Sequence, residues 1–182
     1  AFYYGFSALA WKRQGIPEDM TGVLWATGVA VEIVFLWFFE PWRRAIGMRK
    51  LLVIGGVAAV ARWAAYGFSP PLWVLFPLQG LHALSYAATF LASLQLVARL
   101  STPANASAGQ LINSALSGGV LSGLATLVAG WMFDRTGTLG YLAMAAMSAA
   151  VIAGVVCWKR VTELNPGHQL ARANLDTLDA SA

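Results

Sequence analysis

Long apolar blocks alternate with short polar connections along the whole chain. Six blocks are rich in aliphatic and aromatic side chains, and they cover residues 1–11, 21–39, 51–68, 72–97, 110–133 and 139–158. The last five have the roughly 17–25 residues that an α-helix needs to cross the core of a bilayer. Only helices or closed barrels can span a membrane, and the two-residue alternation of a barrel strand is absent, so the pattern predicts membrane-spanning α-helices.

The connections contain the residues that end helices. Proline or glycine occurs in "KRQGIPEDM", "EPWRRAIGMRK", "GFSPP", "STPANAS" and "DRTGT", and after Lys159 the chain becomes polar. The first block is too short to span alone, and we expect it to be the end of a helix that starts upstream. We therefore predict an all-α membrane protein with one six-helix transmembrane bundle over residues 1–160, its first helix truncated, and a polar cytoplasmic tail over residues 161–182.

The composition supports a membrane protein. The chain is 58% hydrophobic and 11% charged, whereas a soluble domain has about 25% charged residues. Its net charge of +4 forms no continuous basic face, so we expect membrane lipid and not nucleic acid as a partner. Cys157 is the single cysteine, which excludes a disulfide within the chain and a cysteine-based metal site. We expect no cofactor and no metal.

The distribution of lysine and arginine between the connections predicts the orientation. With the N-terminus in the cytoplasm, the outer connections hold Lys12, Arg13 and Arg135. The inner connections and the start of the tail then hold the larger basic set, which is Arg43, Arg44, Arg49, Lys50, Arg99, Lys159 and Arg160. Because cytoplasmic loops carry the excess of basic residues, both ends of this segment are predicted to be cytoplasmic.

Three ionisable residues lie inside apolar blocks at similar depths. Glu32 and Arg62 each follow about eleven residues of their block, and His82 follows about ten, which corresponds to roughly 16 Å of helix. Gln79 and Tyr86 flank His82 on the same helix face. These positions place an acid, a guanidinium and an imidazole near the middle of the bilayer.

A lone charge at that depth costs roughly 2.5–3.5 kcal/mol on insertion scales. We therefore expect Glu32 to pair with Arg62 inside the bundle. The pair could be a static contact that fixes helix packing, but buried ion pairs stabilise poorly compared with apolar side chains. A titratable histidine at the same level favours a site that binds a polar solute or passes a proton.

The fifth block carries small residues at helical spacing. Gly118, Gly119, Ser122 and Gly123 let two helix backbones approach closely, and we predict that they pack against another helix. A helix that slides or rocks against a neighbour would use the same residues. The candidates to line a cavity near the ionisable residues are Tyr4, Trp25, Gln79, Tyr86 and Asn113.

Four segments resemble the phenylpropionate permease family of the major facilitator superfamily, which is related to lactose permease and to nucleoside–proton symporters. They are "YYGFSALAWKRQGI", "GVLWATGVAVEIVF", "ARWAAYG" and "LQGLHALSYAATF". The resemblance implies the C-terminal six-helix half of a twelve-helix carrier in the bacterial inner membrane. It implies alternating access against a missing N-terminal half of the same polypeptide, with the substrate site at the midplane between the halves.

The resemblance also implies roles for the three ionisable residues. In the lactose permease branch a glutamate, an arginine and a histidine on the eighth, ninth and tenth helices take part in sugar binding and proton coupling, and the matching positions are Glu32, Arg62 and His82. Two positions depart from related patterns, since Ser85 stands where lactose permease has a second carboxylate and Phe90 where the phenylpropionate family often has a second histidine.

The resulting prediction is a secondary active transporter, not an enzyme. We expect a proton symporter that moves a small organic solute such as an aromatic acid. One alternative is a non-transporting membrane scaffold or sensor. Another is an intramembrane serine hydrolase that uses His82 with Ser117 or Ser122, although the chain has no G-x-S-x-G elbow.

Overall fold

The computed structural model describes the backbone of residues 1–102 and 104–164 and is helical in nearly all of it. Residues 165–182, which form most of the predicted tail, lie outside the described residues. So do the side chains of five predicted cytoplasmic basic residues, Arg43, Arg44, Arg99, Lys159 and Arg160. The predicted tail and the orientation therefore remain predictions.

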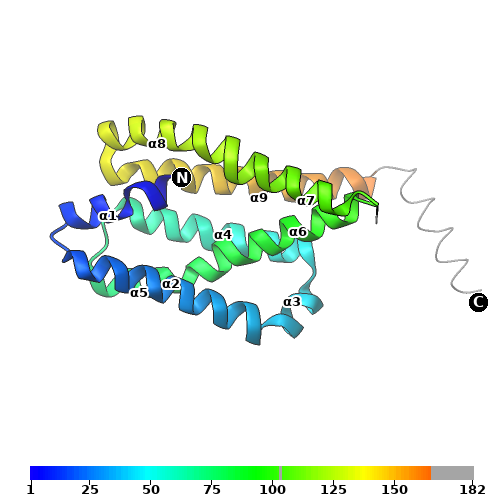
Figure 1. Cartoon of the computed structure of the whole chain (residues 1–182), viewed down its shortest axis with the longest axis horizontal. Helices are drawn as coiled ribbons and strands as arrows, with labels where there is room; N and C mark the ends of the chain where they lie inside the picture. The colour runs from blue at the N-terminus through cyan, green and yellow to red at the C-terminus, as the bar shows by residue number, and fades with distance from the viewer. Residues whose placement is uncertain (103, 165–182) are drawn as a thin grey trace, which may run out of the picture.

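Six helical rods follow the six apolar blocks and run along the long axis of the molecule (Figure 1). Four rods are single helices, α1 (Phe2–Arg13), α2 (Glu18–Phe38), α4 (Met48–Gly67) and α9 (Gly140–Leu164). Two rods are composite, α5 (Leu72–His82) with η1 (Ala83–Ala87) and α6 (Ala88–Leu100), and α7 (Ala106–Ser114) with η2 (Ala115–Leu121) and α8 (Ser122–Thr136). The predicted all-α membrane fold is confirmed.

Length and composition mark the membrane-spanning parts. The candidate spans among the described residues are Glu18–Phe38, Met48–Gly67, Leu72–Ala98 and Ala106–Cys157. The last of these contains two rods joined by the 3₁₀ turn η3 (Gly137–Leu139), where Gly137 has a positive φ of 58°. The glycine allows the reversal because it lacks the Cβ that would clash in this conformation.

A short helix that the sequence did not predict fills the connection between α2 and α4. The segment "EPWRRAIGMRK" breaks the chain as expected, but its first part forms α3 (Glu40–Ile46). Pro41 is tolerated because the first turn of a helix needs no internal hydrogen bond from its N–H groups. Gly47, at a φ of 77°, then separates α3 from α4.

Both composite rods contain a π-helical turn in the middle. In one rod the turn is η1, which begins directly after His82. A π turn adds a residue to one helical turn and re-aims the side chains around it, and such turns are frequent at functional sites. Pro77 lies one turn before His82, so this rod is irregular where the predicted histidine site lies.

Close backbone approaches place α4 among its neighbours. A Cβ added at Gly55 would lie 2.8 Å from the carbonyl oxygen of Leu84 in η1, and one added at Gly56 would lie 2.5 Å from Cγ1 of Ile152 in α9. α4 also packs on α5 and α6. Since these glycines have no side chain, α4 can occupy this central position.

The two apolar cores differ in character. An aromatic core lies along α1, at the ends of α4 and α8 and at the start of α9, and it includes Phe2, Tyr3, Trp11, Tyr66, Phe133 and Tyr141. A smaller core at α2, α4, η1 and α6 is built from Phe35, Leu51, Ala83, Ala87 and Ala88. The first core is therefore dense with rings, whereas the second consists largely of alanine.

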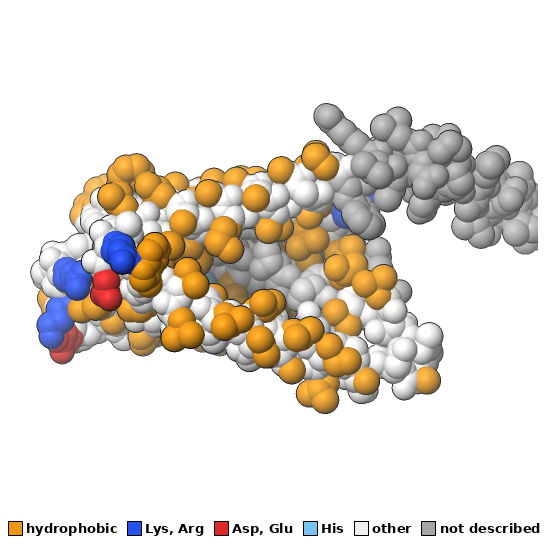
Figure 2. All heavy atoms as spheres, turned by 90° about the horizontal axis from the view of Figure 1, so that it is seen from above, with side chains coloured by type: hydrophobic (Ala, Val, Ile, Leu, Met, Phe, Trp, Pro, Cys, Tyr) orange, Lys and Arg blue, Asp and Glu red, His pale blue; other side chains and the backbone are white. Residues whose placement is uncertain are grey.

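The small-residue face of η2 and α8 is open in this chain. A Cβ added at Gly118, Gly119 or Gly123 would meet nothing within 4 Å, and no residue of α7 or η2 is buried. In the space-filling view most of the visible charged side chains gather at one end of the molecule, a further basic side chain is visible at the opposite end, and hydrophobic side chains are spread over the face between them (Figure 2). Packing of Gly118, Gly119, Ser122 and Gly123 against another helix remains a prediction.

Candidate functional site

Arg62 lies in the second half of α4 and is surrounded by aromatic rings. The residue is only 1% exposed. Its Cζ lies 4.5 Å from the ring centroid of Tyr3, 4.5 Å from that of Trp63 and 5.5 Å from that of Tyr66. The faces of these rings attract the guanidinium charge and offset part of its loss of hydration.

The hydrogen bonds of Arg62 fix the tautomer of His82. Nη1 of Arg62 lies 2.9 Å from Nδ1 of His82, and Nη2 donates to Oε1 of Gln79 at 3.3 Å. Nη1 also lies 3.5 Å from Oγ of Ser85. Because a guanidinium can only donate, Nδ1 must accept, and the imidazole is then neutral with its proton on Nε2.

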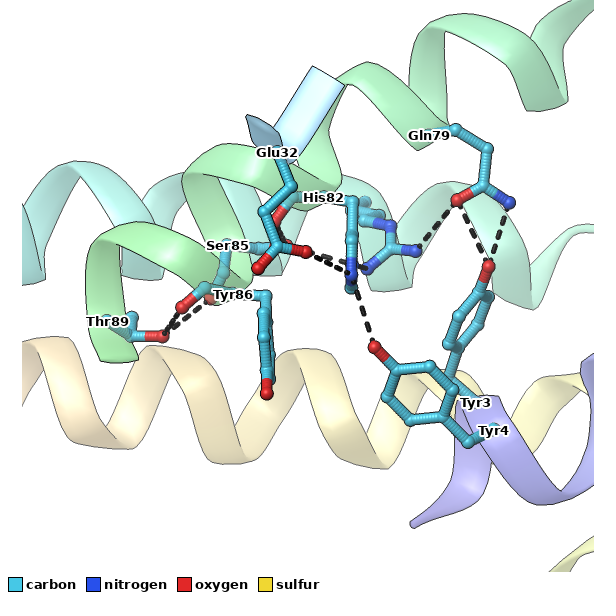
Figure 3. Close-up of polar contacts among 9 residues, drawn as sticks. Tyr3, Tyr4, Glu32, Gln79, His82, Ser85, Tyr86 and Thr89 are labelled. Carbon is cyan, nitrogen blue, oxygen red and sulfur yellow. Dashed lines mark hydrogen bonds and ion pairs between the residues drawn. The ribbon is translucent and has the colours of Figure 1, made fainter. Parts of the chain in front are cut away.

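The other nitrogen of His82 faces an acid and a hydroxyl. Nε2 lies 3.8 Å from Oε2 of Glu32 and 3.2 Å from Oη of Tyr4 (Figure 3). Both oxygens can accept the same N–H. The site therefore consists of a series in which Glu32, His82 and Arg62 follow one another across three helical rods.

The predicted contact between Glu32 and Arg62 is wrong in its detail. The two side chains form no ion pair within the described part of the chain, and His82 lies between them. The reason is the packing of the rods. α2 packs on α5 and η1, which separate it from α4.

Gly28 is a site residue that the sequence analysis missed. A Cβ at this position would lie 3.2 Å from Oε1 of Gln79 and 3.6 Å from Cδ2 of His82. Gly28 lies one turn before Glu32 on α2, so its missing side chain lets Glu32 approach His82. The signal in the sequence was a glycine four residues before a buried acid, on the same helix face.

Tyr3 is a second missed residue. Its hydroxyl donates to Oε1 of Gln79 at 3.0 Å and accepts from Nε2 of Gln79 at 2.8 Å. Its ring also covers Arg62. Tyr3 therefore fixes the amide that receives Nη2 of Arg62, and the tyrosine pair at the start of the chain was its only signal in the sequence.

Three of the predicted cavity-lining residues contact the cluster. Tyr4 and Gln79 do so through hydrogen bonds, and the ring of Tyr86 stacks on His82 with centroids 5.2 Å apart and planes 6° apart. Phe90 continues the stack, at 6.1 Å and 5° from Tyr86. Tyr86 and Phe90 are 44% and 48% exposed, so an aromatic surface opens beside the imidazole.

Trp25 and Asn113 form no hydrogen bond or ring contact with these residues in the described structure. Trp25 is 39% exposed on α2. The backbone carbonyl of Asn113 accepts a hydrogen bond from Oγ of Ser117 at 2.6 Å, within the same rod. Their part in a cavity remains a prediction.

The arrangement does not resemble a serine hydrolase. Both ring nitrogens of His82 already face other groups, and the hydroxyl of Ser117 is directed to its own helix. Neither Ser117 nor Ser122 forms a hydrogen bond with His82 in the described structure. The residues with described positions also contain no group of three or more His, Cys, Asp or Glu that could hold a metal ion.

Comparison with known proteins adds independent findings. Residues 1–143 match the MFS_1 like family. Over 137 residues the chain is 28% identical to the "Probable 3-phenylpropionic acid transporter" of Escherichia coli (strain K12), covering 75% of this chain and 36% of that protein. It is 26% identical over 147 residues to the "Uncharacterized transporter YwbF" of Bacillus subtilis (strain 168), covering 80% and 37%.

A third relative carries the name of a sugar carrier. The chain is 30% identical over 126 residues to the "Maltose permease" of Geobacillus stearothermophilus, covering 65% of this chain and 32% of that protein. The chain thus spans about a third of the length of these relatives. No solved structure matches it.

Proposed function

The chain belongs to the MFS_1 like family of the major facilitator superfamily, and from that premise we propose that it forms the C-terminal six-helix half of a proton-coupled carrier for a small organic solute. The three relatives above are named as transporters or permeases, which supports transport in general. The observation that carries the proposal is the series of Glu32, His82 and Arg62 on three rods. A contact that only fixes helix packing would not require an acid, an imidazole and a guanidinium next to one another.

In this proposal the partner of the chain is the rest of its own polypeptide. The chain matches about a third of each relative, which leaves room for a second bundle in the full-length protein. Two bundles that rock against each other around a midplane site would give alternating access. A bacterial inner-membrane location with both ends of this segment in the cytoplasm fits the basic connections.

Proton coupling would centre on Glu32. Its carboxylate faces Nε2 of His82, and the other titratable or charged groups around that imidazole are Tyr3 and Tyr4 from α1, Arg62 from α4 and Tyr86 from η1. Protonation of Glu32 removes the charge that faces the N–H of His82. That change weakens the contact between α2 and the end of α5 and can therefore bias a movement of these rods.

An aromatic carboxylate is the substrate class that we propose. The exposed rings of Tyr86 and Phe90 offer a stacking surface for an aromatic ring. Arg62, through His82, provides positive charge at one end of that surface, which suits a carboxylate. The name of the Escherichia coli relative agrees with this class, whereas the name of the Geobacillus relative makes a sugar the second candidate.

Glu32→Gln in the full-length protein tests the coupling. Glutamine keeps the size of the side chain but cannot gain or lose a proton, so we expect uphill uptake to disappear while exchange of solute down its gradient continues. Glu18→Gln is the matched control, because Glu18 begins the same helix but is exposed and pairs with Lys12.

Two results would count against the proposal. Undiminished accumulation in Glu32→Gln would remove the acid from the coupling. Absence of any uptake by the wild-type protein of aromatic acids, sugars and nucleosides would favour a scaffold or a sensor.

A further inference from the structure

A groove lies between the start of α4 and the end of α9, at the end of the bundle away from the aromatic core. Its volume is about 350 Å³. Its lining residues are Arg49, Lys50, Val53, Ile54, Val155 and Val156, and nearly all of the lining surface is apolar, so the two basic residues line it with their aliphatic stems. The helices touch closely at Gly56 and Ile152, and the groove opens just beyond that contact.

The two basic residues of the groove have no described partner. Arg49 and Lys50 are exposed in the first turn of α4, which contains no acidic residue. Every other lysine or arginine whose side chain is described has an ion-pair, hydrogen-bond or aromatic partner. Lys12 pairs with Glu18 at 2.6 Å, Arg62 bonds to His82, and Arg13 and Arg135 lie over the rings of Phe133 and Trp131.

The position of the groove fits the surface of a membrane. The candidate span Met48–Gly67 begins at this point, so Arg49 and Lys50 lie at the level of lipid headgroups, and Val53 and Ile54 lie one turn deeper. Basic residues beside the end of a transmembrane helix attract anionic lipids. Branched aliphatic side chains offer an acyl chain the surface that it meets in a bilayer.

We propose that this groove binds one anionic phospholipid, with its phosphate at the charged ends of Arg49 and Lys50 outside the apolar lining and an acyl chain along the four aliphatic residues. The two unpaired cations select an anionic lipid over a zwitterionic one. The apolar walls select a lipid over a free phosphate. The site is separate from the Glu32–His82–Arg62 series, so it stands whether or not the transport proposal holds.

Native mass spectrometry of the full-length protein tests the proposal. Delipidated protein is mixed with phosphatidylglycerol or with phosphatidylcholine of the same acyl chains. We expect one phosphatidylglycerol to be retained and preferred over phosphatidylcholine. At about 1 kcal/mol for each basic residue, Arg49→Gln combined with Lys50→Gln should weaken phosphatidylglycerol binding by about 10–30-fold.

Two further variants separate charge from shape. Val53→Trp fills the groove and keeps both cations, so it should reduce retention of phosphatidylglycerol as well. Lys12→Gln combined with Arg13→Gln is the matched control, since it removes two adjacent basic residues at the opposite end of the bundle and should leave retention unchanged.

Three outcomes would overturn the proposal. Equal retention of the two lipids by the wild-type protein would mean that the cations select nothing. Competition by glycerol phosphate as strong as that of the intact lipid would mean an anion site without an acyl groove. A third outcome is the absence of retained lipid, combined with a Val156→Cys side chain, in a Cys157→Ser background, that does not react with a membrane-permeable maleimide. It would mean that another part of the polypeptide fills the groove.

Discussion

Arg62 organises the site at the scale of single residues. Its two terminal nitrogens reach His82, Gln79 and Ser85, while rings from α1 and α4 cover its charge. A planar fork can make these contacts together, whereas a single ammonium cannot. The guanidinium, and not only its charge, is therefore the feature on which the cluster depends.

Arg62→Lys tests this dependence. Lysine keeps the charge but loses the fork, so it cannot donate to both His82 and Gln79 as the guanidinium does, and Oε1 of Gln79 keeps only the donor from Tyr3. We expect a loss of about 1–3 kcal/mol in stability, measured by thermal unfolding in detergent. Arg13→Lys at the exposed end of α1 should change stability by less than about 0.5 kcal/mol. Equal effects of the two substitutions would show that the fork contributes nothing.

The stack of His82, Tyr86 and Phe90 leads to a prediction about selectivity. Tyr86→Leu removes the central ring, and the lost stacking corresponds to a rise of about 2–10-fold in KM for an aromatic acid. Tyr86→Phe keeps the ring and should behave like the wild type. A KM that is unchanged in Tyr86→Leu, measured by uptake of labelled substrate, would place the solute elsewhere.

At the scale of elements, glycines set the distances between rods. The Cβ that Gly55→Ala adds would lie 2.8 Å from a backbone oxygen of η1, which cannot rotate away as a side chain can. We expect α4 to be pushed from η1, at a cost of about 1–3 kcal/mol in thermal stability. Gly80→Ala on α5 is the control, because a Cβ there meets nothing within 4 Å. Unfolding of Gly55→Ala at the same temperature as the wild type would show that α4 and η1 can accommodate the added methyl group.

The elements also show what the sequence could predict. Six apolar blocks predicted six rods because hydropathy reports which residues avoid water, and the same reasoning brought Glu32, Arg62 and His82 to one depth. Hydropathy does not report which rods are neighbours. The prediction therefore paired Glu32 with Arg62, although α5 and η1 stand between α2 and α4.

Other features had almost no signal in the sequence. The π turn η1 follows His82 in a stretch that reads as ordinary helix. α3 forms in a segment whose proline and glycine indicated only a break. Gly28 and Tyr3 belong to the site because they lie close to Gln79 and His82. Those distances depend on how whole rods approach each other, which the sequence does not report.

At the scale of the whole molecule, η2 and α8 present an open apolar face. Its exposed apolar residues include Leu116, Val120, Leu121, Leu124, Leu127 and Val128. Lipid could cover such side chains, but glycines at Gly118, Gly119 and Gly123 suit a closely packed helix. The remaining two thirds of the length of the relatives could supply one.

Gly119→Leu in the full-length protein tests this contact. If another helix packs there, the larger side chain should separate the two and lower both uptake and thermal stability. Gly154→Leu on α9 is the control, since it also has nothing within 4 Å of an added Cβ and lies outside the small-residue face. Equal behaviour of the two variants would leave lipid as the neighbour of this face.

The donor at Nδ1 of His82 has a consequence for how charge moves through the molecule. A ring that conducts a proton must receive it at one nitrogen and release it from the other, and here the guanidinium blocks the second nitrogen. In this arrangement the imidazole can exchange a proton at Nε2 but cannot pass it on from Nδ1. In the proposed carrier, passage of a proton through the ring would first require Nδ1 to lose its contact with Arg62. Proton transfer and a rearrangement between α4 and α5 would then occur together.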